Sequence, residues 1–246
     1  MPQVGDSGAD LARWQRATAI GAMTTQLPSP AVQHPDLKEP DLPLLHDRTY
    51  SVRSYRRSSD SMLIRGQIQD QKPPGVYIHG DPEPLTVHHM VVDIVVAFPD
   101  LRITEASVVM ETHPHASCVK ITDHYEKLVG LSIARGFTHK IRELFGGPRG
   151  CTHTTALLQA MAPVAVQSIW SMHASEIDGT PVRPPMPSNP TDEQIRERFA
   201  HNLNSCHVWA EDGETIAKIK AGEEFETPLW VQDRLEKLGL DESAWH

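Results

Sequence analysis

The sequence has few cysteines and no long hydrophobic run, and these absences limit where the protein can act. Its 246 residues include three cysteines, and an odd number of widely separated cysteines does not suggest a disulfide framework. No apolar segment approaches the ~20 residues that a membrane-spanning helix needs, and the N-terminus lacks a signal-peptide pattern. We therefore expect a cytoplasmic protein with no membrane partner.

Basic residues are also scarce. The chain has 23 Lys and Arg residues against 32 Asp and Glu residues, which gives a net charge of −9. Because nucleic-acid binding needs clustered Lys and Arg, we expect no nucleic-acid partner. The chain also lacks a phosphate-binding loop, a dinucleotide fingerprint and a nucleophile elbow, so it shows none of the common motifs of nucleotide-binding proteins and serine hydrolases.

Proline and histidine, by contrast, are abundant, with 20 and 14 residues. Five of the prolines fall between Gln26 and Pro43, a composition typical of an extended arm. The hydrophobic content of 39% suits a globular protein. We expect a mobile Pro-rich arm over residues 1–45, a single core domain over residues 46–215, and a C-terminal extension with a short helix over residues 216–246.

Four strand-like segments follow the arm, and helical segments follow them. β-Branched residues and loose alternation predict strands at residues 49–56, 62–70, 85–98 and 101–111, and the short turns within each pair indicate antiparallel order. Apolar spacing predicts helices at residues 123–129, where Asp123 and Glu126 have capping-box spacing, at 137–145, and from residue 152, where Pro163 should kink or split the helix. The sequence thus predicts an α+β fold, an antiparallel sheet of about four strands covered by helices.

The clearest polar feature is the turn that leads from Gly146 into the last of these helices. It brings Arg149, Cys151 and His153 within five residues, at a helix N-terminus whose dipole favours anions. A thiol at such a position tends to have a lowered pKa and is more nucleophilic. We predict that His153 transfers protons, that Arg149 holds an anionic substrate group and that Cys151 is a pocket thiol. A capped helix with a small buried cysteine is the alternative.

The third predicted strand adds two polar residues to this hypothesis. Side chains alternate along a strand, so His89 and Asp93 lie on the same side. On this interpretation His89 is the second acid–base group, while Asp93 and Tyr55 join Arg149 in binding the substrate. A solvent-exposed His89 beside a half-buried strand explains the same pattern equally well.

The cysteines also allow a metal hypothesis, because each of them has a histidine nearby in the sequence. Cys118, Cys151, His153 and Cys206 lie at the edges of predicted elements and are of the residue types that bind zinc. Their spacing matches no zinc finger or zinc ribbon, and packing without a metal accounts for them as well. The cofactor prediction is therefore either none or zinc.

The core also contains a series of short motifs, of which the most specific is Gly150-Cys151-Thr152-His153. The others are Tyr55-Arg56-Arg57, His89-Met90, Pro114-His115-Ala116-Ser117-Cys118, Leu128-Val129-Gly130, Gly136-Phe137 and Cys206-His207-Val208-Trp209-Ala210. Over roughly residues 48–213 these motifs resemble an uncharacterised bacterial family, the domain of unknown function 2889. His115 and Thr154 depart from its pattern, which has an aromatic residue and a leucine there. The resemblance implies a role in the bacterial catabolism of aromatic and other small carbon compounds.

These observations predict a small-molecule catabolic enzyme of the lyase or hydrolase type. It would carry out acid–base chemistry on an oxygenated or aromatic substrate. The alternative is a non-catalytic binding or assembly protein in which the Cys and His residues form a structural metal site. A homo-oligomer is compatible with both functions.

Overall fold

The computed structural model describes residues 41–134, 136–174, 190–223 and 227–244. The chain divides into two compact units, residues 1–43 and 44–246, and the second unit contains the fold discussed below. The predicted Pro-rich arm over residues 1–45 lies outside the described residues, except for its last five.

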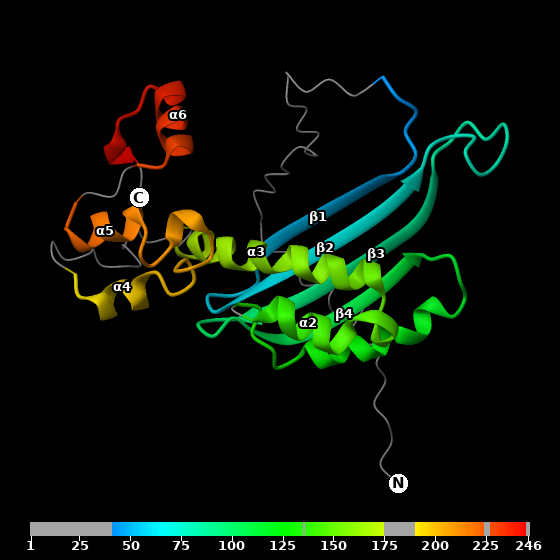
Figure 1. The fold of residues 1–246 in the computed structure, drawn as a ribbon, viewed down its shortest axis with the longest axis horizontal. Helices are drawn as coiled ribbons and strands as arrows, with labels where there is room; N and C mark the ends of the chain where they lie inside the picture. Colours follow the sequence, from blue (N-terminus) through cyan, green and yellow to red (C-terminus); the bar gives the residue numbers. More distant parts are fainter. Residues whose placement is uncertain (1–40, 135, 175–189, 224–226, 245–246) are drawn as a thin grey trace, which may run out of the picture. The chain divides into compact units, whose positions relative to one another are not determined.

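A four-stranded antiparallel sheet forms the centre of the second unit (Figure 1). Its strands follow the chain order and are β1 (Asp47–Arg56), β2 (Ser61–Lys72), β3 (Leu85–Ala97) and β4 (Arg102–Thr112). The α+β prediction is confirmed. The strands also begin and end within two residues of the predicted positions. Each strand is bounded by turn-forming residues, and its apolar residues recur at every second position on one face. That face buries Met62, Ile64, Ile68, Met90, Val92 and Ile94.

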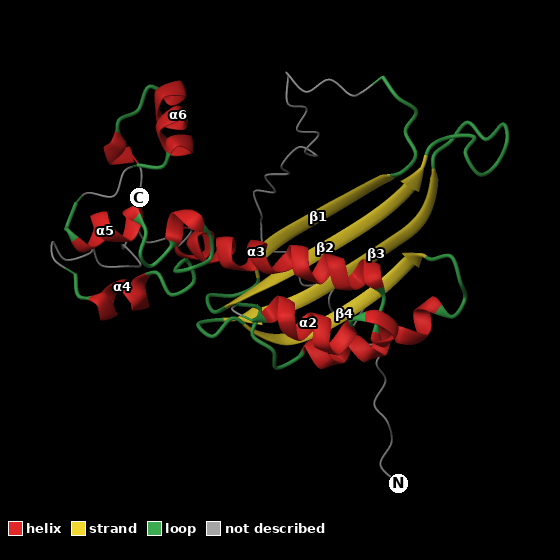
Figure 2. Ribbon diagram, viewed as in Figure 1, coloured by secondary structure: helices red, strands yellow, loops and turns green. Residues whose placement is uncertain are grey.

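Helices cover this apolar face of the sheet (Figure 2). They are η1 (Cys118–Leu128), α2 (Phe137–Phe145), η2 (Gly147–Arg149) and α3 (Thr152–Ala174), and α3 contacts β1, β2 and β3. Gly66 of β2 allows α3 to pack closely, because a Cβ there would lie 2.7 Å from the sulfur of Met161. The guanidinium of Arg56 in β1 also donates a hydrogen bond to the carbonyl of Met172 in α3.

Two local predictions differ from the structure. Pro163 does not split α3, which runs as one helix from Thr152 to Ala174, because Leu157, Leu158, Met161 and Ala165 are completely buried on both sides of the proline. The segment at Asp123 forms 3-10 turns that begin earlier, at Cys118, and Ser117 precedes them without a side-chain cap. The predicted capping box is therefore wrong.

The C-terminal part of the unit has a small core of its own. Its elements are α4 (Asp192–Arg198), η3 (His207–Trp209), α5 (Glu214–Lys220), α6 (Leu229–Leu238) and η4 (Glu242–Ala244). The buried residues of this core are Ile195, Leu203, Ile216 and Ile219, and Phe199 and Trp209 pack against them. The predicted boundary between residues 215 and 216 falls inside α5.

Within the described residues, no helix combines the length and the hydropathy that crossing a membrane requires.

Candidate active site

A buried carboxylate, Asp70, lies near the end of β2. Its side chain is 1% exposed, and it continues the covered face on which Ile64 and Ile68 are buried. Arg48 lies directly opposite in β1 and donates two hydrogen bonds to it, from Nε to Oδ1 at 2.6 Å and from an Nη to Oδ2 at 2.7 Å. These bonds lower the pKa of Asp70 to about 2 and raise the pKa of Arg48. Asp70 is therefore ionised at neutral pH although it is buried.

Three histidines approach the same carboxylate from different segments. His88 Nδ1 and His153 Nε2 each lie 3.1 Å from Oδ2, and His46 Nε2 lies 3.4 Å from Oδ1. The rings of His88 and His153 stack with their centroids 3.8 Å apart. We call Asp70 with His46, Arg48, His88 and His153 the Asp70 cluster. It forms where β1 and β3 begin, β2 ends and α3 begins, at one end of the sheet (Figure 1).

His153 is held as a neutral base within this cluster. Burial and the adjacent His88 lower its pKa, while the charge of Asp70 opposes the shift. A neutral imidazole carries one N–H, and the contact with Asp70 favours the tautomer with that hydrogen on Nε2. The Nδ1 atom then has a free lone pair. It lies 3.6 Å from the sulfur of Cys151.

The position of Cys151 is fixed by a buried tyrosine. The backbone N–H of Cys151 donates to the hydroxyl of Tyr125 at 2.8 Å, and the ring of Tyr125 stacks on Phe145 with a centroid distance of 4.7 Å. Burial raises the pKa of Tyr125, so its phenol stays protonated. Contacts from Cys151 to His153, from His153 to Asp70 and from Asp70 to Arg48 form a continuous series of polar groups. Such a series can move a proton from the thiol to an imidazole that a carboxylate orients.

A family model matches this part of the chain. It is described as "Protein of unknown function (DUF2889)" and covers residues 46–167. Residues 46–167 belong to this family. The DUF2889 region contains Cys151, Tyr125 and every residue of the Asp70 cluster, so the candidate site lies entirely within it. Its end at residue 167 leaves the Cys206 motif outside the match. No curated protein and no solved structure matches the chain.

The structure brings together two of the predicted catalytic residues of the DUF2889 region, Cys151 and His153. It places Arg149 elsewhere. The Nε of Arg149 donates to the carbonyl of Glu143 at 2.9 Å, and an Nη donates to the carbonyl of Arg142 at 3.3 Å. Arg149 therefore binds backbone carbonyls at the end of α2, and the cation near His153 is Arg48.

Three other predicted site residues lie on the opposite face of the sheet. The odd-numbered positions of β3 point away from α3, so His89 and Asp93 are separated from His153 by the sheet itself. Asp93 pairs with Arg65 through contacts of 2.8 and 2.6 Å. Tyr55, which is 46% exposed, lies opposite Leu63 on that same open face. The structure therefore does not support a site that combines these residues with His153.

Sequence reasoning missed Asp70, His88, Arg48 and His46, although a signal for two of them was present. The buried alternation in β2 runs through Ile64 and Ile68 to Asp70, and the buried alternation in β3 runs from Met90 back to His88. An aspartate and a histidine that continue an apolar face are candidates for a buried polar site. Choosing His89 in place of its neighbour selected the wrong face.

The predicted zinc ligands do not assemble as expected. Among the described residues, the one group of His, Cys, Asp or Glu side chains with the geometry to hold a metal ion is Asp70, His88 and His153, whose ligand atoms all lie within 4.8 Å of one another. This group shares only His153 with the prediction. Cys118, Cys151 and Cys206 are free thiols, and Cys206 is exposed.

Proposed function

We propose that the protein is an enzyme that performs acid–base chemistry on a small molecule, with His153 as the proton-transfer residue. The observation that carries this proposal is the ionised, buried Asp70 with two stacked imidazoles on one of its oxygens. A desolvated carboxylate in contact with a histidine of lowered pKa, here His153, is typical of catalytic sites. A structural role alone would be served equally well by apolar side chains of similar volume.

Each residue of the cluster has a distinct task in this mechanism. His153, whose pKa is lowered, accepts a proton at Nδ1 from a substrate or from Cys151. Asp70 orients the ring through Nε2 and stabilises the imidazolium that forms. Arg48 keeps Asp70 ionised, and His88 restricts the ring of His153 by stacking on it.

The role of Cys151 distinguishes two reaction types. In a hydrolase, the proton of Cys151 passes to His153, the thiolate attacks a substrate carbonyl, and the imidazolium returns the proton to the leaving group. Water then cleaves the thioester. In a lyase, His153 alone removes and returns the proton, and Cys151 serves as part of the wall.

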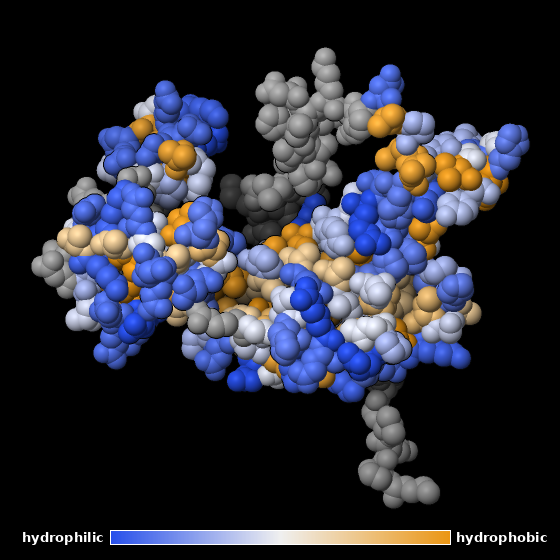
Figure 3. All heavy atoms as spheres, viewed as in Figure 1, coloured by the Kyte–Doolittle hydropathy of each residue, from blue (hydrophilic) through white to orange (hydrophobic). Residues whose placement is uncertain are grey.

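The surroundings of the cluster fit an oxygenated substrate with an apolar part. The loop between β2 and β3 joins the strands of Asp70 and His88, and it exposes Val76, Tyr77 and Ile78 by 51, 66 and 54%. Figure 3 shows hydrophobic surface over this protruding loop. Such exposed apolar side chains can contact the aromatic part of a substrate. Three free cysteines suit a reducing, cytoplasmic environment.

The chain provides a matched pair of histidines for the test. We would incubate wild-type protein, H153N and H89N with small aromatic esters, ethers and hydroxyketones and measure products by mass spectrometry. Loss of general acid–base catalysis should lower turnover in H153N by about 10²–10⁴-fold, while H89N, on the opposite face, should retain it. C151A then distinguishes the two reaction types. It should abolish turnover by a hydrolase, which needs the thiol, and leave turnover by a lyase. Equal activity of H153N and H89N would refute the proposal.

A bound metal ion is the second candidate, because Asp70, His88 and His153 form a two-histidine, one-carboxylate set. Zinc is the ion we propose for these ligand types. Elemental analysis of purified protein tests this directly. One equivalent of zinc that is lost in both H88N and H153N supports a metal site, whereas metal-free, active protein excludes it. A binding or assembly role remains the alternative to catalysis.

A further inference from the structure

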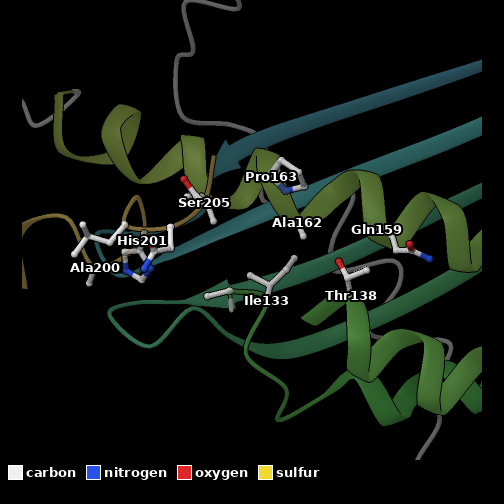
Figure 4. A pocket seen from close by; sticks show the side chains of 12 residues that line it. Ile133, Thr138, Gln159, Ala162, Pro163, Ala200, His201 and Ser205 are labelled. Carbon is white, nitrogen blue, oxygen red and sulfur yellow. The ribbon is translucent and has the colours of Figure 1, made fainter. Parts of the chain in front are cut away.

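A separate cavity lies beside the middle of α3, about 270 Å³ in volume. Its walls come from α3, from Ile133 and Ala134 before α2, from Thr138 in α2, and from the segment that follows α4, where Ala200, His201, Leu203, Asn204 and Ser205 line it. Figure 4 shows Ala162 and Pro163 of α3 on one side, with Ile133 and His201 across from them. No residue of the Asp70 cluster lines this cavity, so it is distinct from the candidate active site.

The described part of the lining favours a neutral ligand. None of the described residues that line the cavity is Asp, Glu, Lys or Arg, although these types make up 22% of the chain, and His201 is the one titratable side chain among them. A charged group entering a site without a counter-charge loses its hydration and gains no ion pair. The apolar part of the wall includes Ile133, Ala162, Val166 and Leu203. These side chains favour a hydrocarbon ring.

The polar part of the wall offers hydrogen bonds to a neutral group. Pro163 has no N–H, so the carbonyl of Gln159, four residues earlier in α3, lacks its usual helical donor. Gln159 and Pro163 both line the cavity. Thr138 and Ser205 add two hydroxyl groups to the lining. A ligand hydroxyl can donate to and accept from the hydroxyl groups of Thr138 and Ser205.

We propose that this cavity binds a small, neutral molecule that combines an apolar ring with at least one hydroxyl group. The volume lies near the lower end of the range for ligand pockets, which restricts the ligand to roughly the size of a substituted single ring. This binding does not depend on the proton-transfer chemistry proposed for His153. Residues 159–166 lie about two to three helical turns beyond His153 along α3, so the two sites share one rigid element.

The test uses two probes of similar shape and different charge. Benzyl alcohol and benzoate are titrated into full-length protein whose Ile, Leu and Val methyl groups are ¹³C-labelled, and methyl NMR spectra are recorded. Benzyl alcohol should give saturable shifts at Ile133, Val166 and Leu203. Benzoate should bind at least ~10-fold more weakly, because the described residues that line the cavity include no Lys or Arg to pair with its carboxylate.

Variants that fill the cavity with a larger side chain, together with a matched control, test whether benzyl alcohol binds there. A162M places a longer side chain in the cavity, and A160M makes the same change at a half-buried position of α3 that does not line it. A162M should weaken benzyl alcohol binding by ~10-fold or more, and A160M should leave it within ~2-fold. V166F is a second filling variant if A162M does not fold.

Three outcomes would overturn the proposal. They are the absence of saturable shifts at millimolar benzyl alcohol, equal binding of benzoate, and binding that the filling variants do not weaken. H153N should bind benzyl alcohol normally, so failure of this proposal and failure of the catalytic proposal are distinguishable.

Discussion

At the scale of single residues, the sheet contains two forked Arg–Asp pairs with very different surroundings. Arg48–Asp70 and Arg65–Asp93 both join neighbouring strands through two hydrogen bonds. Asp70 is 1% exposed on the covered face, whereas the side chain of Asp93 is 19% exposed on the open face. Solvent weakens the attraction within the second pair. In the first pair, loss of the buried carboxylate would leave Arg48 without its partner and would cost more stability.

This contrast predicts unequal costs for the same substitution. D70N removes a buried charge that Arg48 requires, so we expect it to lower the free energy of unfolding by roughly 3 kcal/mol at pH 7. D93N acts on a partly hydrated pair and should cost less than about 1 kcal/mol. Urea denaturation of the two variants measures both values. Equal costs would show that burial does not distinguish the two pairs.

The pH dependence of stability follows from the same groups. The pKa of Asp70 falls from 3.8 to about 2 on folding, so its contribution is present above pH 4 and is lost as the pH falls toward 2. The difference between wild type and D70N should therefore narrow over that interval. His153 titrates below its ordinary pKa of 6.5 in the folded state, so protonation of the unfolded chain lowers stability as the pH falls below 6.5. In H153N, the free energy of unfolding should not show this additional decrease between pH 7 and pH 5, as measured by urea denaturation at a series of pH values.

At the scale of elements, the start of α3 depends on η1. Tyr125 of η1 accepts the hydrogen bond from the N–H of Cys151, immediately before α3 begins at Thr152. Thr155 in the first turn donates its hydroxyl hydrogen to the carbonyl of Phe145 at the end of α2. These two contacts fix the first turn of α3, and therefore the position of His153, without any side chain of the Asp70 cluster.

We therefore expect Y125F to loosen the candidate site while keeping the fold. The substitution leaves the N–H of Cys151 without its acceptor, which should cost about 1–2 kcal/mol. Hydrogen exchange of the Cys151 amide should become faster, and catalysis should fall although no catalytic side chain is altered. Y55F is the control, since Tyr55 is 46% exposed on the open face of the sheet, away from the Asp70 cluster. Equally protected Cys151 amides in both variants would contradict this role of Tyr125.

At the scale of the whole molecule, the described part of the second unit contains two separate hydrophobic cores. The large core uses residues between Met62 and Ile169, and the small one uses residues between Ile195 and Ile219. The DUF2889 region contains nearly all of the first core and none of the second.

A chain that ends at Ala174 should consequently keep the sheet, α3 and the Asp70 cluster. We expect it to unfold in one cooperative transition by circular dichroism, and to lose benzyl alcohol binding because residues 200–205 are absent. I195A in the full chain should destabilise the small core alone. A truncated chain without cooperative unfolding would show that the large core depends on the C-terminal part.

The sequence by itself determined the secondary structure and its order. Alternating apolar residues between turn signals define β1 to β4, and the Gly146-Gly147 break separates α2 from α3, because these patterns act locally along the chain. The sequence also identified Cys151 and His153, which lie two residues apart at a helix start. Pro163 does not split α3, because the packing of α3 on the sheet outweighs a local helix-breaking preference.

Only the tertiary structure decided which residues share a site with His153. Asp70, His88 and Arg48 are distant from it in sequence and meet it because strand register and the packing of α3 bring four element ends together. Neighbouring residues of β3 point to opposite faces of the sheet, so His88 lies on the covered face and His89 on the open face. Arg149 is adjacent to the site in sequence, yet its guanidinium binds two backbone carbonyls at the end of α2. Proximity along the chain therefore could not establish this site, because its contacts depend on which face and which end of the sheet each side chain occupies.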